Sequence, residues 1–110
     1  MNSIASIALS GLTAASDRLS AREENIANQQ TEGYRPITPV QTASAVGPVV
    51  RSERSPTAQT RDPGTGLVMP QSDMASDIVD SIESGIAYKA SAKLLKVSQD
   101  LDKSLLDVLA

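Results

Sequence analysis

The chain opens with a segment whose apolar residues return at a regular spacing. Four of them stand seven residues apart: Ala5, Leu12, Leu19 and Ile26. Ala8 and Ala15 follow two of these positions by three residues. This spacing is typical of the a and d positions of a helix that packs against a partner along one side. The pattern predicts an amphipathic helix over residues 2–28, with Leu12, Leu19 and Ile26 as subunit-packing positions.

A second apolar stripe runs through the other end of the chain. Its members are Val79, Ile82, Ile86, Ala90, Leu94, Val97, Leu101, Leu105 and Val108. Their mean spacing of about 3.6 residues is the α-helical period. Pro70 precedes the stripe, and Ser72 or Asp73 is suited to cap a helix N-terminus. These signals predict a long helix over residues 72–109, whose stripe is expected to pack against other helices.

The middle of the chain has a different composition. All six prolines lie between Pro36 and Pro70, and no hydrophobic period is sustained there. Val46–Arg51 and Leu67–Met69 are short β-like runs bounded by turn residues. The middle is therefore predicted to be an extended Pro-rich loop, and the presence of a short β-hairpin within it is left open. Three segments result, 1–34, 35–71 and 72–110, which together form one domain.

The two helical patterns predict a mainly α fold. At 1.5 Å per residue the helices would be about 40 and 55 Å long, and they are expected to form an antiparallel coiled-coil hairpin. Pairing of the two helices buries only one face of each. The remaining apolar width predicts an interface with other subunits, so packing is expected both within and between subunits.

The composition argues against chemistry as the role of the chain. Its 110 residues include no Cys and no His, and Tyr34 and Tyr88 are the only aromatic residues. Thiolate ligands and the usual acid–base group at neutral pH are thereby excluded. The carboxylates at 73, 77, 80 and 83 are better interpreted as a solvated helix start than as a metal site. No enzyme activity, cofactor or metal is expected.

Charge and hydropathy also limit the partners. The net charge of −3 does not favour nucleic acid. No stretch reaches the roughly 18–20 apolar residues that cross a bilayer, so direct membrane insertion is not expected. Residues 1–16 lack the basic start of a cleaved secretory signal. If the protein leaves the cytoplasm, another export route is implied.

The first helical pattern ends in a specific stop. The residues from Asn25 to Tyr34 read Asn-Ile-Ala-Asn-Gln-Gln-Thr-Glu-Gly-Tyr. Asn28 tolerates the backbone conformation that ends a helix, and Gly33 allows a positive φ. Pro36 then holds Arg35 extended. Considered alone, this run is a helix C-cap followed by a loop.

Together, the two ends of the chain resemble the bacterial flagellar axial proteins, which form the rod, hook and hook-associated structures. The resemblance rests on residues 10–19, 25–34, 73–80 and 87–93, and its most specific positions are Asn25, Asn28, Thr31, Gly33, Tyr34, Ala87 and Tyr88. Ser91 departs from the usual Asn of that family. The short middle is most similar to proximal-rod members of the C type.

The resemblance implies a function and a location. It implies a structural rod component of the flagellar basal body, in the periplasmic space, that polymerises through its terminal helices into the drive shaft used for motility. The implied partners are other copies of the chain, other rod proteins and the type III export apparatus, with no cleaved signal peptide. A soluble coiled-coil export adaptor or chaperone of the flagellar system is the alternative.

Overall fold

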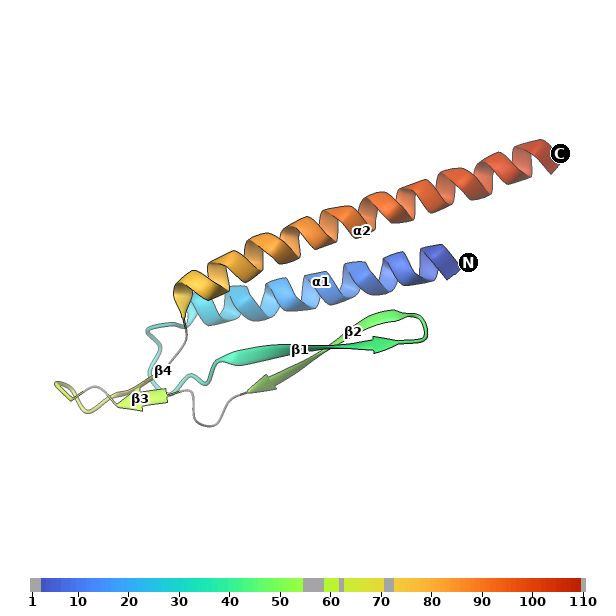
Figure 1. The fold of residues 1–110 in the computed structure, drawn as a ribbon. Coiled ribbons are helices and arrows are strands. Elements are labelled where there is room, and N and C mark those ends of the chain that lie inside the picture. Colours follow the sequence, from blue (N-terminus) through green and yellow to red (C-terminus); the bar gives the residue numbers. More distant parts are fainter. Residues whose placement is uncertain (1–2, 55–58, 62, 71–72, 110) are drawn as a thin grey trace.

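The computed structural model describes residues 3–54, 59–61, 63–70 and 73–109, and these residues are mainly helical. In chain order the elements are α1 (Ser3–Ala27), β1 (Ile37–Ser44), β2 (Gly47–Arg54), β3 (Gln59–Arg61), β4 (Val68–Pro70) and α2 (Met74–Leu109). The molecule is elongated, with extents of 73 × 22 × 15 Å. Figure 1 shows α1 and α2 side by side and running in opposite directions.

The two predicted helices are confirmed, each to within two residues of its expected ends. At the start of α2, the Asp73 carboxylate accepts hydrogen bonds from the backbone N–H groups of Ala75 and Ser76, at 3.1 and 3.3 Å. These bonds satisfy two of the donors that a helix N-terminus leaves free. Asp73 is therefore the cap, while Ser72, the other candidate, lies outside the described residues.

The helices meet through small side chains. On α1 the buried residues include Ala5, Ala8 and Ala15, and on α2 Ser84 and Ser98 are at most 2% exposed. Between them, a Cβ added at Gly11 would stand 2.8 Å from the hydroxyl oxygen of Ser91. Because the distance between packed helices depends on the side chains at their contact, this seam brings the two backbones close together.

This seam corrects part of the packing prediction. Within the chain, the large residues of the stripe are at least 43% exposed, because the serines at 84, 91 and 98 occupy the inward-facing positions. Leu12, Leu19 and Ile26 of α1 are only half-buried at the flank of the seam. Packing of the stripe between subunits remains a prediction.

The middle of the chain is more regular than its prolines suggest. β1 and β2 form an antiparallel hairpin of eight residues per strand, in register from Ile37–Arg54 to Ser44–Gly47. The short hairpin that the sequence left open is therefore present, and it takes up much of the expected extended loop. Pro39 and Pro48 fit because both strands of a two-stranded sheet are edges, where a missing N–H can face outward.

The hairpin packs along α1, beside the pair of helices (Figure 1). Ser10 on α1 donates a hydrogen bond to the Pro48 carbonyl at 2.5 Å. At the adjacent Gly47 the φ angle is +117°, and an added Cβ would lie 3.0 Å from the Ser10 Cβ. Both the backbone angle and the close approach of α1 therefore require glycine. β3 and β4 form a smaller antiparallel pair. This pair lies beyond the end of the hairpin that is remote from its turn (Figure 1).

Candidate functional site

The helix stop identified in the sequence is a buried clasp centred on Asn25. This side chain is 2% exposed. Its Nδ2 donates to the Ile37 carbonyl at 2.7 Å, and its Oδ1 accepts from the Ile37 N–H at 2.8 Å. The amide therefore pairs with a backbone residue as a neighbouring strand would. Tyr34 adds a third bond, from its hydroxyl to Asn25 Oδ1 at 2.9 Å. The clasp holds the start of β1 against the last turns of α1.

The remaining motif residues form the turn that leads into this clasp. Asn28 donates from Nδ2 to the Glu24 carbonyl at 2.9 Å, and its Oδ1 accepts from the Thr31 hydroxyl at 3.2 Å. Gly33 has a φ of +77° and donates its N–H to the Val68 carbonyl of β4 at 2.8 Å. The motif therefore ends α1, reverses the chain and ties the turn to β4.

Tyr34 also meets a charged pair at the end of the hairpin. The Arg54 guanidinium lies 5.5 Å from the centre of the Tyr34 ring and 3.1 Å from the Glu24 carboxylate. Burial of the phenol raises the pKa of Tyr34, and the negative charge of Glu24 raises it further, although Arg54 acts in the opposite direction. The neutral phenol is therefore the form that the folded chain favours.

This shift predicts an alkaline loss of stability that depends on Tyr34. Because the folded-state pKa lies above that of an unfolded tyrosine, about 10, the stabilisation is complete below that pH and is lost as pH rises through the folded-state pKa. Urea unfolding from neutral to strongly alkaline pH is expected to show a steeper decline for the natural chain than for Tyr34→Phe. Equal declines would contradict the prediction. Tyr88→Phe is the control, because Tyr88 is 41% exposed.

An ion-pair cluster, which sequence reasoning missed, joins the same ends of the two helices. Arg22 of α1 contacts Asp77 at 3.1 Å and Asp80 at 2.8 Å, with the Asp77 side chain only 4% exposed. The two carboxylates stand three residues apart on α2 and therefore share one face of it. No sequence signal links residues 55 positions apart, so the prediction of a simply solvated acidic start is wrong for Asp77.

Removing Arg22 is expected to destabilise the chain by about 2 kcal/mol. The loss leaves Asp77 buried without its cation, and the value lies below the 3–5 kcal/mol of fully buried pairs because Arg22 is partly exposed. Chemical denaturation of Arg22→Met measures the change. Arg51→Met removes a cation from an exposed pair with Glu53 and should cost at most about 1 kcal/mol. Similar costs for both variants would show that burial of Asp77 has no role.

Beside this cluster lies a polar hollow of about 280 Å³ between α1, β1 and α2. Its charged lining is balanced, with Arg18 and Arg22 facing Asp80 and Glu83. Such a lining gives no preference for an anion or a cation. Among the described residues, no group of three or more His, Cys, Asp or Glu side chains could hold a metal ion.

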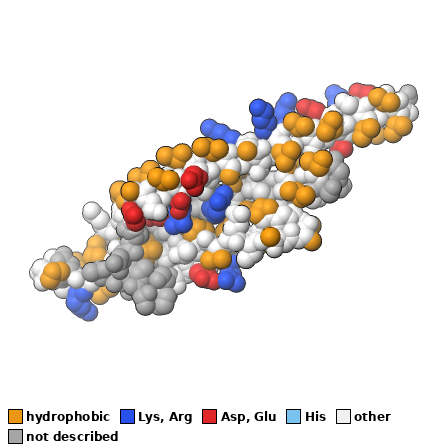
Figure 2. All heavy atoms as spheres, in the orientation of Figure 1, with side chains coloured by type: hydrophobic (Ala, Val, Ile, Leu, Met, Phe, Trp, Pro, Cys, Tyr) orange, Lys and Arg blue, Asp and Glu red, His pale blue; other side chains and the backbone are white. Residues whose placement is uncertain are grey.

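The stripe of α2 lies on the outside of the molecule. Its large members are 43–81% exposed: Val79, Ile82, Ile86, Leu94, Val97, Leu101, Leu105 and Val108. Figure 2 shows apolar side chains following α2 from its start to its C-terminal end. Ala87 is half-buried, and the adjacent Tyr88 is exposed. The structure thus separates the site residues into two groups, the clasp between elements and an uncovered aliphatic surface.

No described helix is both long enough and apolar enough to span a membrane. Comparison with protein-family models and with curated proteins finds no match to this chain. The fold defines a mainly helical protein with two antiparallel helices, a β-hairpin packed against α1 and an exposed aliphatic stripe on α2.

Proposed function

We propose that the chain is a structural component of the bacterial flagellar basal-body rod, polymerising through its terminal helices into the axial drive shaft. The observation that carries the proposal is the outward stripe of α2. The eight large aliphatic side chains of this stripe are exposed along one helix. Exposed apolar surface of this extent is typical of an interface rather than of a free surface. The motif resemblance at both ends of the chain supports an axial assembly as the place of that interface.

The proposed assembly extends the packing within the chain into a coiled coil. The Ala–Ser seam joins α1 and α2 within one subunit, and the stripe of α2 would pack into the helices of neighbouring subunits. The half-buried Leu12, Leu19 and Ile26 would complete those contacts. In this arrangement the clasp has a geometric role, because it fixes where α1 ends and how the hairpin leaves the helical layer.

The proposed setting is the rod in the periplasmic space. Neighbouring subunits would be other copies of this chain and other rod proteins, and delivery would use the type III export apparatus without a cleaved signal. The chain would need no cofactor and perform no catalysis. Nucleic acid and direct membrane insertion have no part in the proposal.

Deletion of the gene in its own flagellated bacterium tests the proposal. The expected result is a non-motile strain whose basal bodies have no rod beyond the inner membrane, with both defects restored by the natural gene. A motile, rod-bearing deletion strain would refute the rod assignment. If the chain were instead an export adaptor or chaperone, it would be a small soluble oligomer absent from purified basal bodies.

A further inference from the structure

The charge that accompanies the stripe of α2 changes along the helix. Residues 74–83 carry three carboxylates and no cation, and residues 100–109 carry three carboxylates and one lysine. Between these two ends, residues 84–99 carry three lysines and no carboxylate. Among the described residues, Lys96 pairs with Asp100 at 3.6 Å, whereas Lys89 and Lys93 form no ion pair. The middle of the stripe, from Ile86 to Val97, is therefore its cationic part.

A groove lies between α1 and the hairpin, which Figure 1 shows running along α1. Its volume is about 410 Å³. Most of the side chains that α1 contributes are small: Ser6, Ser10, Thr13 and Ala14. The aliphatic lining consists of Leu9 from α1 and of Val46, Val49 and Val50 from the hairpin. Since side-chain ridges of one helix pack into grooves of another, this groove suits a row of large side chains from a second helix.

The groove and the middle of the stripe match in length and in charge. Along α1 the groove extends over positions 6–17, about 16 Å of helix, and positions 86–97 of α2 span the same length. Asp17 is the one charged residue of the lining, and nearby Arg51 of β2 is already paired with Glu53. Either acidic end of the stripe would bring like charges beside Asp17, whereas the cationic middle brings the opposite charge.

We infer that the middle of the stripe of one copy docks in the groove between α1 and the hairpin of a second copy, with Lys89 beside Asp17. The exposed ion pair contributes little affinity, and its role is to select the register. The stripe and the groove are different surfaces of the same subunit, so the contact is heterologous and repeats from copy to copy. The inference deepens the proposed function and rests on it for the direction in which the copies point.

The axial setting determines the register of the contact. Copies in such an assembly point the same way, so the neighbour's α2 runs antiparallel to α1, as the chain's own α2 does (Figure 1). With Ile86 beside Asp17, the antiparallel direction places Ala90, four residues later, beside Thr13. Both Thr13 and Ala90 are exposed within the chain, so each is open to substitution.

Disulfide trapping tests the contact in the full chain, which has no natural cysteine. Because a disulfide needs Cβ atoms within about 4.5 Å, Thr13→Cys mixed with Ala90→Cys under mild oxidation should form the crossed dimer about tenfold faster than the control mixtures. The controls combine Thr13→Cys with Val79→Cys or Val108→Cys, at stripe positions about 16 and 27 Å from Ala90 along the helix. Equal rates in the three mixtures, or a faster control, would overturn the inference.

Val49→Asp, added to the Thr13→Cys chain, supplies a second test because it places a carboxylate in the aliphatic lining of the groove. The Thr13–Ala90 cross-link should slow to the rate of the controls while far-UV circular dichroism stays unchanged. Ser52→Asp adds the same charge at an exposed position of the same strand and should leave the cross-link intact. An unaffected cross-link in the Val49 variant, or an equal loss in the Ser52 variant, would contradict docking in the groove.

The deletion strain separates this contact from the proposed function. A deletion strain without rods, together with no preference for the Thr13–Ala90 cross-link, would refute the contact and leave the rod assignment standing. A motile, rod-bearing deletion strain, together with a fast Thr13–Ala90 cross-link, would refute the rod assignment and leave the contact between copies standing.

Discussion

Replacing Asn25 by alanine is expected to lower the free energy of unfolding by about 3 kcal/mol, the largest stability effect of any single change considered. Three hydrogen bonds end at this side chain, and two of them satisfy the backbone N–H and carbonyl of Ile37. Without the amide these two groups stay buried and unpaired. Since small domains unfold with about 5–15 kcal/mol, the loss is a large share of the total. Urea unfolding followed by circular dichroism measures it.

Two further variants distinguish the clasp from a general effect of losing an asparagine. Asn28→Ala removes bonds that are exposed, so it should cost only about 1 kcal/mol. Asn25→Asp keeps the acceptor but places a carboxylate oxygen against the Ile37 carbonyl, and acid that protonates this carboxyl should recover part of the stability. If Asn25→Ala cost no more than Asn28→Ala, the clasp would not be the principal tie between α1 and the hairpin.

Substituting glutamine at Val79, Ile82 and Ile86 together is expected to abolish assembly while leaving the subunit folded. These side chains are 53%, 60% and 63% exposed within the chain. Burial against a neighbour would contribute about 1.5 kcal/mol or more for each. The triple change therefore weakens the subunit contact by a factor on the order of 10³. Sedimentation velocity across a concentration series measures the assembly.

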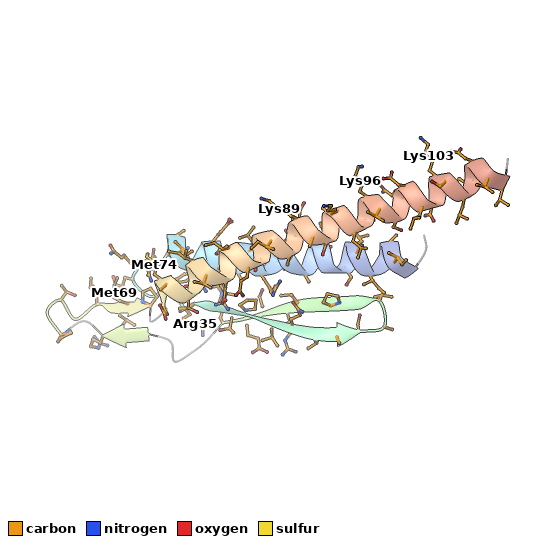
Figure 3. The ribbon with its side chains drawn as sticks, turned by 45° about the horizontal axis from the view of Figure 1, so that its top comes forward. Arg35, Met69, Met74, Lys89, Lys96 and Lys103 are labelled. Atoms are coloured by element: carbon orange, nitrogen blue, oxygen red, sulfur yellow. The ribbon has the colours of Figure 1, made fainter. Side chains whose placement is uncertain are left out.

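The control uses the same helix and the same number of changes. Lys89, Lys93 and Lys96 are exposed, and Figure 3 shows the labelled Lys89 and Lys96 projecting from α2 away from α1. Glutamine at all three should leave assembly within a few-fold of the natural chain, because exposed charges contribute little. Unfolding of either triple variant should stay within about 0.5 kcal/mol of the natural chain. If the variant with glutamine at Val79, Ile82 and Ile86 still assembled, the proposal that the stripe forms the subunit interface would be contradicted.

The helical period predicted both helices, and cap-forming residues limited the start of the second to Ser72 or Asp73, because these features depend on residues close together in sequence. It did not predict which face of α2 meets α1. The large aliphatic residues suggested the seam, but Ala8, Gly11 and Ser91 allow a closer approach of the two helices and leave the stripe outside. A sequence pattern shows that a face is apolar, and only the three-dimensional arrangement shows whether the same chain covers it.

The hairpin and the clasp show a second reason for incomplete prediction. Pro39 and Pro48 indicated a loop because proline has no backbone N–H to donate to a neighbouring strand. In a two-stranded sheet, however, each strand has one unpaired edge, so both prolines can be accommodated. Asn25 was identified within the helix stop, but its pairing with Ile37 depends on a strand twelve residues later. Likewise, the link from Arg22 to Asp77 and Asp80 joins distant segments that only the fold brings together.

Mass spectrometry of purified hook–basal bodies tests the central claim most directly. The account predicts that peptides of this chain co-purify with the basal body at a level comparable to other rod components, and that the Val79/Ile82/Ile86 glutamine variant is missing from the particles although the cells produce it. Basal bodies with a complete rod that contain no peptide of this chain would contradict the account.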